Sequence, residues 1–283
     1  MQVYVNGEWL AKEDAKVSVW DHGLLYGDGL FEGMRIYGGK LFRLEDHMIR
    51  LYDGAGALLI TIPHSREELS ELVLEAVRRN GRENGYIRLV ITRGVGNLGI
   101  DPSTCPRAGV IIIVDGIQLY PEELYTRGIK VVTAATRRLS GDIFDPRVKS
   151  LNYLTNIMAK LEAAQAGCPE AVMLSREGYL TECTADNLFL VKGGVLKTPA
   201  PWLGILEGIT RKTILELAAG EGIPAEEGTY NRTDLYLADE VFLTGSGAEI
   251  IPVTRADGRI IGNGEPGPVS ARLRKAFRRL IGD

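Results

Sequence analysis

One lysine of this 283-residue chain stands where an ammonium group can face a pocket. The residues before Lys149 favour an irregular loop, since Gly141, Asp145 and Pro146 are typical loop residues. The residues after it, 152–166, carry apolar side chains at helical spacing. Most lysines are solvated surface charges, so position alone does not give Lys149 a chemical role. The polar residues elsewhere in the chain decide the question.

Four further features could supply partners for such a lysine. Glu182 lies in a predicted irregular break between two strands, and Arg50 lies on a predicted helix. A glycine-led turn precedes the helix that starts near Ile209 and Thr210, and a second turn of small residues occupies 245–247. A helix N-terminus offers free N–H groups and a positive dipole end to an anion. The sequence thus combines an amine, a carboxylate and several anion-binding groups.

This combination suits pyridoxal 5′-phosphate. The cofactor requires an amine for a Schiff base and an acidic partner for its pyridine nitrogen, which Lys149 and Glu182 could provide. Its phosphate dianion requires a cradle of the kind that turns, helix N-termini and an arginine such as Arg50 supply. The sequence therefore predicts a site for pyridoxal phosphate.

The elements that would position these residues fall into two groups, as expected for a chain too long for a single core. The first 117 residues predict a strand-rich α+β domain, in which Ser65 and Glu68 form a capping box that opens a helix. Glycines at 23, 27, 29 and 33 permit close backbone approach, as the wall of a pocket often requires. The expected elements of this domain are strands at 3–5, 86–94 and 110–114 and helices at 44–58 and 66–80.

A polar stretch without strong periodicity, 118–129, is the predicted linker, and residues 130–283 form the predicted second domain. Strand structure resumes at Ile129. The stretch 179–191 predicts two strands around an irregular break. Further elements are expected at 171–175 and 240–244 as strands and at 152–166, 209–218 and 268–281 as helices.

Composition excludes several classes of protein. The formal charge of −4 and the pI of about 5.6 indicate no nucleic-acid-binding surface. No apolar run reaches the length of a membrane span, and the first residues lack the pattern of a secretory signal. The three cysteines, Cys105, Cys168 and Cys183, form no CxxC pair and no ligand cluster with the three histidines. We therefore expect a soluble cytoplasmic protein without a bound metal.

The chain resembles the fold-type IV pyridoxal-phosphate transaminases, which include branched-chain aminotransferases, D-amino acid transaminases and aminodeoxychorismate lyases. The resemblance runs from Val3 to about Val253. It implies an α+β fold with a small N-terminal α/β domain and a larger, β-barrel-like C-terminal α/β domain that binds the cofactor. The motifs that carry it are Val148-Lys149-Ser150-Leu151-Asn152-Tyr153-Leu154, Leu180-Thr181-Glu182-Cys183-Thr184-Ala185-Asp186-Asn187, Gly208-Ile209-Thr210-Arg211 and Leu243-Thr244-Gly245-Ser246-Gly247-Ala248-Glu249.

The resemblance assigns each cofactor-binding residue a role. It implies that Lys149 is the Schiff-base lysine and carries the proton between the substrate Cα and the cofactor, and that Glu182 keeps the pyridine nitrogen protonated. Family members often have glycine after this glutamate, where this chain has Cys183. The remaining cofactor residues that it implies are Arg50, the amides of Ile209 and Thr210 and the Ser246 hydroxyl at the phosphate, and Tyr153 at the phenolic oxygen.

The substrate residues most resemble those of the branched-chain type. By this resemblance Phe31 and Gly33 line an apolar pocket, and Arg88 binds the distal carboxylate of glutamate or 2-oxoglutarate. Tyr26 reaches in from a partner subunit of a homodimer or higher homo-oligomer. The resemblance also implies substrate contacts from Arg35 and Tyr86 and from the amides of Ser246 and Gly247. We therefore expect transfer of amino groups between leucine, isoleucine or valine and 2-oxoglutarate.

Three alternatives remain open at the level of sequence. Arg93, in Thr92-Arg93-Gly94, lies where D-amino acid transaminases carry a carboxylate-binding arginine, so a D-amino acid transaminase is the second hypothesis. An aminodeoxychorismate lyase is the third. A non-catalytic binding or scaffold protein that retains the fold is the fourth, although Lys149, Glu182 and Arg50 together argue against it.

Overall fold

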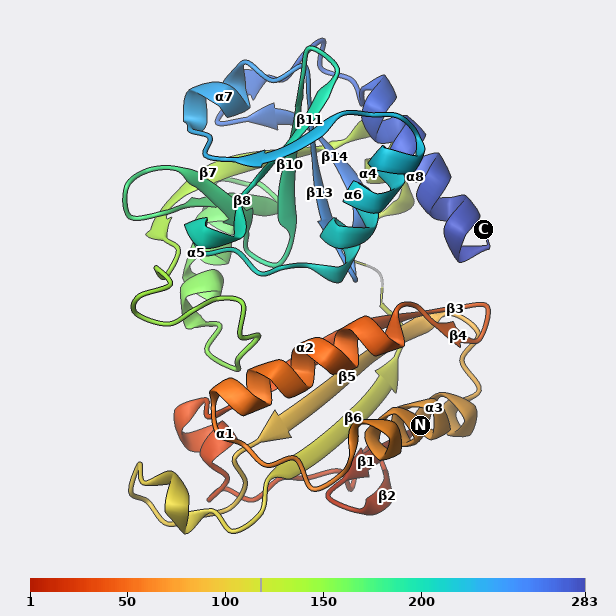
Figure 1. Ribbon diagram of the computed structural model, residues 1–283, viewed down its shortest axis with the longest axis vertical. Coiled ribbons are helices and arrows are strands. Elements are labelled where there is room, and N and C mark those ends of the chain that lie inside the picture. The colour runs from red at the N-terminus through yellow and green to blue at the C-terminus, as the bar shows by residue number, and fades with distance from the viewer. Residues whose placement is uncertain (118, 283) are drawn as a thin grey trace. The chain divides into compact units, whose positions relative to one another are not determined.

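The chain folds into two compact units. The first comprises Met1–Ile117 together with the short segment Val148–Asn152, and the second comprises Gln118–Arg147 and Tyr153–Asp283. The computed structural model describes residues 1–117 and 119–282, so Gln118, the first residue of the predicted linker, lies outside the described residues. Figure 1 shows the elements of each unit.

The first unit is built on an antiparallel sheet of six strands in the order β2-β1-β6-β5-β3-β4. Along β3 the side chains of Leu30, Met34 and Ile36 are buried in the core, as expected where alternate residues of a strand face a helix layer. The strands are β1 (Gln2–Val5), β2 (Glu8–Ala11), β3 (Gly29–Tyr37), β4 (Lys40–Leu41), β5 (Gly85–Thr92) and β6 (Gly109–Asp115).

Two helices pack against this sheet. Helix α2 (Leu44–Ala57) lies along β3, and α3 (Arg66–Asn80) packs on β1 and β6, as can be followed in Figure 1. The predicted capping box is confirmed, because the Ser65 hydroxyl accepts from the Glu68 amide and the Glu68 carboxylate accepts from the Ser65 amide. A short helix α1 (His22–Tyr26) and a 3₁₀ turn η1 (Pro102–Thr104) complete the unit.

The segment Val148–Asn152 is bonded to β3 by its backbone. The Phe31 amide donates to the Lys149 carbonyl at 3.0 Å, and the Leu151 amide donates to the Gly29 carbonyl at 2.9 Å. An isolated bridge joins Leu30 to Ser150. Lys149 is therefore fixed beside Phe31, although most of the neighbouring sequence belongs to the second unit.

The second unit contains a nine-stranded sheet that closes on itself. Its strands follow the order β12-β11-β10-β13-β14-β7-β8-β9, and β9 pairs again with β10, so that six strands form a ring. This closure confirms the predicted barrel-like architecture. The strands are β7 (Ile129–Arg137), β8 (Glu170–Leu174), β9 (Leu180–Cys183), β10 (Asn187–Lys192), β11 (Val195–Pro199), β12 (Ala225–Gly228), β13 (Glu240–Gly245), β14 (Glu249–Ala256) and β15 (Arg259–Ile260), which pairs with β14.

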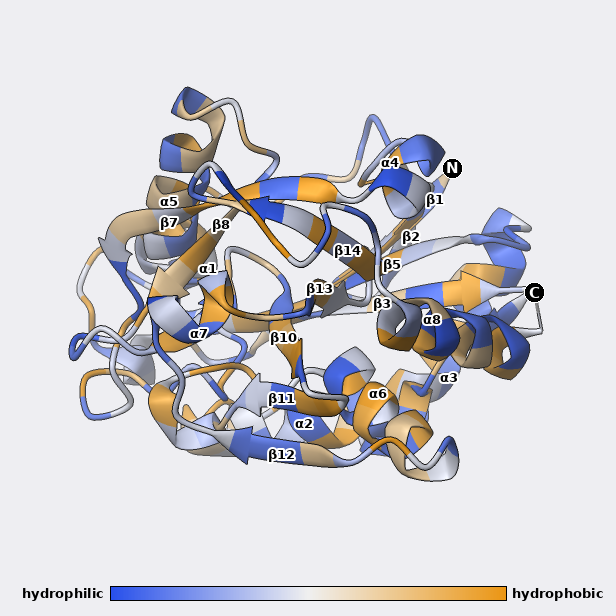
Figure 2. Ribbon diagram, turned by 90° about the horizontal axis from the view of Figure 1, so that it is seen from above, coloured by the Kyte–Doolittle hydropathy of each residue, from blue (hydrophilic) through white to orange (hydrophobic). Residues whose placement is uncertain are grey.

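Several helices of the second unit pack against its sheet. In Figure 2 helix α8 (Pro268–Ile281) shows hydrophilic and hydrophobic residues alternating along its length. The buried carboxylate of Glu240 accepts from the amides of Val269 and Ser270 and so caps the start of α8. The others are α4 (Glu122–Arg127), α5 (Leu154–Gln165), α6 (Ile209–Gly220), α7 (Arg232–Tyr236) and the 3₁₀ turn η2 (Pro201–Leu203).

The structure corrects one placement and refines two others. Glu182 lies inside β9, and the irregular break falls at 184–186, so the prediction that Glu182 itself lies in the break was wrong. The helix expected at 152–166 begins at Leu154. The predicted linker, 118–129, contains the short helix α4.

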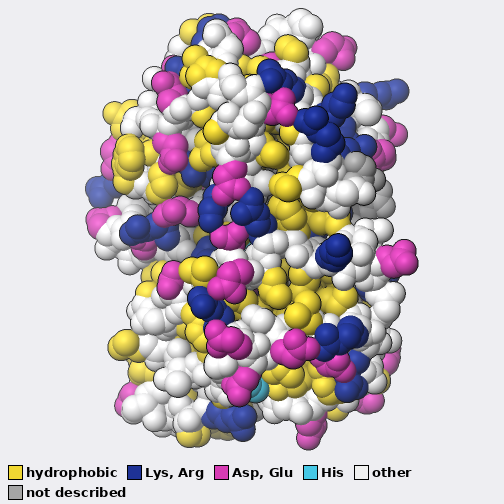
Figure 3. Space-filling model, turned by 45° about the vertical axis from the view of Figure 1, so that its right-hand side comes forward, with side chains coloured by type: hydrophobic (Ala, Val, Ile, Leu, Met, Phe, Trp, Pro, Cys, Tyr) yellow, Lys and Arg dark blue, Asp and Glu magenta, His cyan; other side chains and the backbone are white. Residues whose placement is uncertain are grey.

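The face of the molecule in Figure 3 shows side chains of both charges. On the face shown in Figure 3, acidic and basic side chains are interspersed with hydrophobic ones. Among residues 1–117 and 119–282, no helix is both long enough and apolar enough to cross a membrane. No group of three or more histidine, cysteine, aspartate or glutamate side chains in the same residues could hold a metal ion.

Candidate active site

One face of the first sheet gathers the predicted substrate residues. In the register of β3 and β5, Phe31 pairs with Val90, Gly33 with Arg88 and Arg35 with Tyr86. Since side chains at alternate positions of a strand share a face, these residues project to the same side of the sheet. That side is opposite to the one that packs against α2, where Leu30 and Met34 are buried.

A glycine is required at position 33 of this face. A Cβ atom placed on Gly33 would lie only 1.7 Å from the hydroxyl oxygen of Tyr86. Any side chain there would expel the tyrosine ring from its place. Gly33 therefore leaves room for the Tyr86 hydroxyl above the strand.

The ring of Phe31 connects the substrate residues with the lysine. The guanidinium carbon of Arg88 lies 4.5 Å from the centre of this ring, and Nζ of Lys149 lies 4.6 Å from it. Phe31 is buried, whereas Arg88 and Lys149 are partly exposed. The structure thus places two predicted site residues, both cationic, at the ring of a third.

Arg50 is held by a carboxylate that the sequence analysis did not single out. Its Nε and Nη2 donate to Oε1 and Oε2 of Glu32 at 2.8 and 2.7 Å, and Nδ1 of His47 lies 2.7 Å from Oε2. Burial on its own would raise the pKa of Glu32, but the charges of Arg50 and His47 and their hydrogen bonds outweigh it and hold the pKa well below its usual range. Glu32 is therefore an ionised carboxylate inside the first unit.

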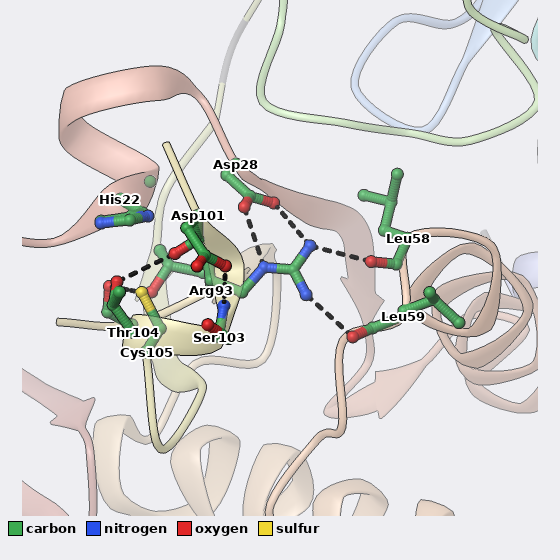
Figure 4. A network of polar contacts seen from close by, with 12 residues as sticks. His22, Asp28, Leu58, Leu59, Arg93, Asp101, Ser103, Thr104 and Cys105 are labelled. Atoms are coloured by element: carbon green, nitrogen blue, oxygen red, sulfur yellow. Dashed lines mark hydrogen bonds and ion pairs between the residues drawn. The ribbon is translucent and has the colours of Figure 1, made fainter. Parts of the chain in front are cut away.

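Arg93 is engaged on all three of its nitrogens. Nε and Nη2 donate to Asp28 at 2.8 and 3.1 Å, Nη2 also donates to the Leu58 carbonyl at 2.8 Å, and Nη1 donates to the Leu59 carbonyl at 2.8 Å. Figure 4 shows the guanidinium between Asp28 and these carbonyls, which follow the end of α2. Arg93 therefore closes the C-terminal end of the helix that carries Arg50.

Tyr26 ends helix α1 and lies partly exposed. Its hydroxyl donates to the Leu98 carbonyl, and its ring packs edge-on against His22 at 5.1 Å. His22 in turn places Nε2 2.8 Å from the Asn97 carbonyl. Helix α1 and the loop after Thr92 are thus joined by side-chain contacts.

In the second unit, Glu182 is the centre of a convergent set of donors. Its Oε2 accepts from the Asn187 side chain at 2.8 Å and from the Leu206 amide at 3.1 Å, and its Oε1 lies 2.6 Å from Nη2 of Arg138. Arg138 also donates to the Asn156 side chain and the Gly204 carbonyl. Three donors around a buried carboxylate are the partners that an ionised acid requires.

The start of α6 is built to approach this region closely. Its N-cap is Gly208, which has no side chain to bond the first amides, and Ile209 and Thr210 follow as buried residues. A Cβ on Gly208 would lie 2.0 Å from Oδ1 of Asn187. The glycine therefore both permits the approach and leaves the first amides of α6 without a side-chain cap.

The second small-residue turn joins β13 to β14 in the same unit. Thr244 lies directly before it, in register with Asn187, which pairs in turn with Glu182. Within the described residues the buried Thr244 hydroxyl has no hydrogen-bond partner. Ser246 and Gly247 are partly exposed at the turn. An orphaned hydroxyl here fits a site that receives a polar ligand.

Two further predicted positions were located. Tyr153 is the N-cap residue of α5 and gives no side-chain cap. Cys183 is buried in the core of the second unit, and burial followed by the charges of neighbouring carboxylates raises its pKa well above the usual value. Since adjacent strand residues point to opposite faces, the Cys183 thiol faces away from the Glu182 carboxylate.

Each unit by itself contains groups of the kinds that pyridoxal phosphate requires. The first unit offers an amine and an arginine held in place, and the second offers a buried carboxylate, an uncapped helix start and a small-residue turn. A family model described as "Amino-transferase class IV" matches residues 29–256. The chain belongs to the class IV aminotransferase family.

Known proteins of the family are similar over nearly the whole chain. A putative branched-chain-amino-acid aminotransferase of Methanocaldococcus jannaschii is 48% identical, covering 99% of this chain and 96% of the relative. A D-alanine aminotransferase of Listeria monocytogenes is 40% identical, covering 98% and 95%. The branched-chain amino acid aminotransferase of Thermobaculum terrenum, solved in its PLP (holo) form, has a TM-score of 0.89 and 30% identity, covering 99% and 93%.

The family confirms the predicted fold type, the predicted pyridoxal phosphate cofactor and the predicted class of enzyme, an aminotransferase. No role in the site was predicted from the sequence for the residues that hold the predicted ones. Those residues are Glu32, His47, Arg138, Asn187 and Leu206.

Proposed function

We propose that this aminotransferase moves amino groups between the branched-chain L-amino acids leucine, isoleucine and valine and 2-oxoglutarate. The observation that carries the proposal is the Arg88 guanidinium over the Phe31 ring at 4.5 Å. One pocket must accept an apolar side chain in one half of the reaction and a second carboxylate in the other. An aromatic ring on β3 and a cation on β5, both on one face of the sheet, meet both requirements.

The engagement of Arg93 argues against the D-amino acid alternative. Four of its five N–H groups are used by Asp28, Leu58 and Leu59. A substrate carboxylate at this arginine would have to displace Asp28, whose own charge repels it. In this proposal Arg93 is a structural residue. It is therefore not free to bind the α-carboxylate of a substrate in the reversed orientation that a D-amino acid would need.

Pyridoxal phosphate, when bound, supplies an electron sink that stabilises negative charge at the substrate Cα. Lys149 would hold the cofactor through Nζ and would carry the proton at the substrate Cα. Glu182 would keep the pyridine nitrogen protonated. Arg50, the amides of Ile209 and Thr210 and the Ser246 hydroxyl would bind the phosphate.

The remaining residues orient the substrate. Tyr153 would contact the phenolic oxygen of the cofactor, and the amides of Ser246 and Gly247 would bind the α-carboxylate. Phe31, Gly33 and the neighbouring residues form the side-chain pocket. On this face Gly33 is required by the Tyr86 hydroxyl, which would meet any larger residue.

We also propose a homodimer or a higher homo-oligomer. The first unit exposes apolar side chains on α1 and the loop after Thr92, among them Leu24, Leu98 and Ile100, the last at 82%. In the second unit, helix α5 exposes an apolar stripe of four residues at helical spacing: Leu154, Ile157, Met158 and Leu161. Contiguous exposed apolar surface of this kind is typical of an interface. Tyr26 lies in the first of these surfaces, as a residue donated to a partner's site should.

The cysteines support a cytoplasmic location. All three are free thiols, as expected in a reducing compartment.

A half-reaction without amino acceptor tests the proposed substrate. The visible absorbance of the cofactor is followed after L-leucine or D-alanine is added separately to the holoenzyme. The proposal predicts conversion by L-leucine and none by D-alanine. Conversion by D-alanine alone would overturn it and return Arg93 to the substrate site.

A further inference from the structure

A buried carboxylate of the first unit has no part in the chemistry proposed above. Glu32 lies between Phe31 and Gly33 on β3, so its side chain projects to the opposite face, toward α2. Its side chain is 1% exposed. A buried charge is costly to desolvate unless groups around it are paired with it.

The hydrogen bonds that hold this carboxylate come from one helix. Nε and Nη2 of Arg50 meet both oxygens of Glu32, in the bidentate arrangement that fixes the plane of a guanidinium. His47 Nδ1 contacts Oε2 from the preceding turn of α2. Glu32 is thus bonded from two sides, and the Nε–Nη2 edge of Arg50 is committed to it.

This geometry leaves the arginine with one defined orientation. A flexible side chain must lose rotamer freedom when it binds an anion, and this loss weakens binding. An arginine already fixed along its Nε–Nη2 edge has lost that freedom during folding. An anion that binds Arg50 then meets a guanidinium whose plane is already set.

We propose that Glu32, supported by His47, is a positioning residue that orients Arg50 for the phosphate group of pyridoxal phosphate. The inference rests on the proposed role of Arg50. It predicts that Glu32 contributes to affinity for the phosphate and not to affinity for the rest of the cofactor.

The test compares two ligands that differ only in this group. The apoenzyme is titrated with pyridoxal phosphate and with pyridoxal, which lacks the phosphate, and binding of each is followed by visible absorbance. In Glu32→Gln the dissociation constant for pyridoxal phosphate should rise about tenfold or more, while that for pyridoxal stays within about twofold. An equal loss for both ligands would overturn the proposal, because a purely structural residue acts on both. Tighter binding of pyridoxal phosphate would also overturn it, since Glu32 would then compete with the phosphate.

Matched variants protect this comparison from general destabilisation. Glu240→Gln makes the same chemical change at a buried carboxylate that caps α8, and it should leave the ratio of the two constants unchanged. Glu32→Asp keeps the charge beside Arg50 but cannot reach as far, so it decides the question if Glu32→Gln fails to fold. For Glu32→Asp, a partial loss of the preference for pyridoxal phosphate over pyridoxal supports the proposal. An unchanged preference overturns it.

Arg50→Gln separates this inference from the function on which it rests. If Arg50→Gln lowers the preference for pyridoxal phosphate while the Glu32 variants do not, the phosphate role of Arg50 stands and the positioning role of Glu32 falls. If Arg50→Gln also leaves the preference unchanged, the assignment of Arg50 to the phosphate fails first.

Discussion

Each unit contains a buried carboxylate paired with an arginine, and the two pairs are used in opposite senses. In the first unit Glu32 and Arg50 approach to 2.7 Å, and in the second Glu182 and Arg138 approach to 2.6 Å. The arginine of the first pair and the carboxylate of the second are the members proposed to contact the cofactor. A buried ion pair can therefore orient either of its members, and the accompanying groups decide which one.

The accompanying groups differ in a way that matches these roles. Within residues 1–117 and 119–282, the groups that contact the Glu32 carboxylate are the charged or chargeable side chains of Arg50 and His47 on α2. Glu182 accepts from one arginine and from two neutral donors, Asn187 and the Leu206 amide. The first pair should thus govern how tightly the cofactor is bound, and the second should govern what the cofactor does once bound.

The largest effect on turnover is expected at Lys149, the proposed Schiff-base lysine. Lys149→Ala should lower turnover by at least about 10⁴-fold, because no other group is proposed to hold the cofactor and move the Cα proton. Steady-state transamination of L-leucine, with circular dichroism to show an intact fold, measures this. A variant that still transaminates at a normal rate would show that Lys149 is not the catalytic lysine.

The next effect separates the two pairs. Glu182→Gln should lower kcat by about 10²–10³-fold at saturating cofactor, because a neutral amide cannot stabilise a protonated pyridine nitrogen. Its affinity for pyridoxal phosphate should change much less than that of Glu32→Gln. The contrast fails if Glu182→Gln mainly loses cofactor and retains its kcat.

A smaller effect is expected at the arginine behind Glu182. Arg138→Gln should lower kcat about tenfold, because Glu182 keeps two neutral donors but loses its charged one. The affinity for pyridoxal should remain close to that of the unaltered protein. A loss as large as that of Glu182→Gln would mean that Arg138 contacts the cofactor and does more than hold the carboxylate.

The smallest effect concerns acid stability. The pKa of Glu32 is lower in the folded protein than in the unfolded chain, where it is about 4.3. The ionised carboxylate therefore stabilises the fold at pH values above about 4.3. This contribution is lost as the pH falls from there toward the pKa of the folded state. The difference in unfolding free energy between the unaltered apoenzyme and Glu32→Gln should shrink by about 1 kcal/mol between pH 7 and pH 3.5. Denaturant unfolding at both pH values measures it. A difference that stays constant or widens would contradict an ionised Glu32.

The sequence was sufficient for the residues that stand in recognisable motifs. Roles for Lys149 and Glu182 could be proposed because both stand in motifs that resemble those of the family. The helix start after Gly208 was predicted from its local sequence and is confirmed. The capping box at Ser65 is confirmed for the same reason, since all of its contacts lie within one turn. Closure of the second sheet between β9 and β10 depends on strand pairing, which the alternation of residues alone does not fix.

The residues that position the others could not be found in this way. Glu32 contacts Arg50, which lies 18 residues later in the chain on α2. Arg138 follows β7 and contacts Glu182 on β9. Arg93 was a candidate ligand for a substrate carboxylate because it stands where D-amino acid transaminases carry such an arginine. Its contact with Asp28, which lies 65 residues before it, could not be predicted from the sequence. Such contacts depend on tertiary packing, and a polar residue shows its role only when its partners are known.

The most direct test of the account is to locate the lysine that holds the cofactor. The holoenzyme is reduced with borohydride, which makes the bond between lysine and cofactor permanent, and its peptides are analysed by mass spectrometry. The account predicts the phosphopyridoxyl group on Lys149, in the segment bonded to β3 beside Phe31. Modification of a different lysine would contradict the site described here and the roles of both ion pairs.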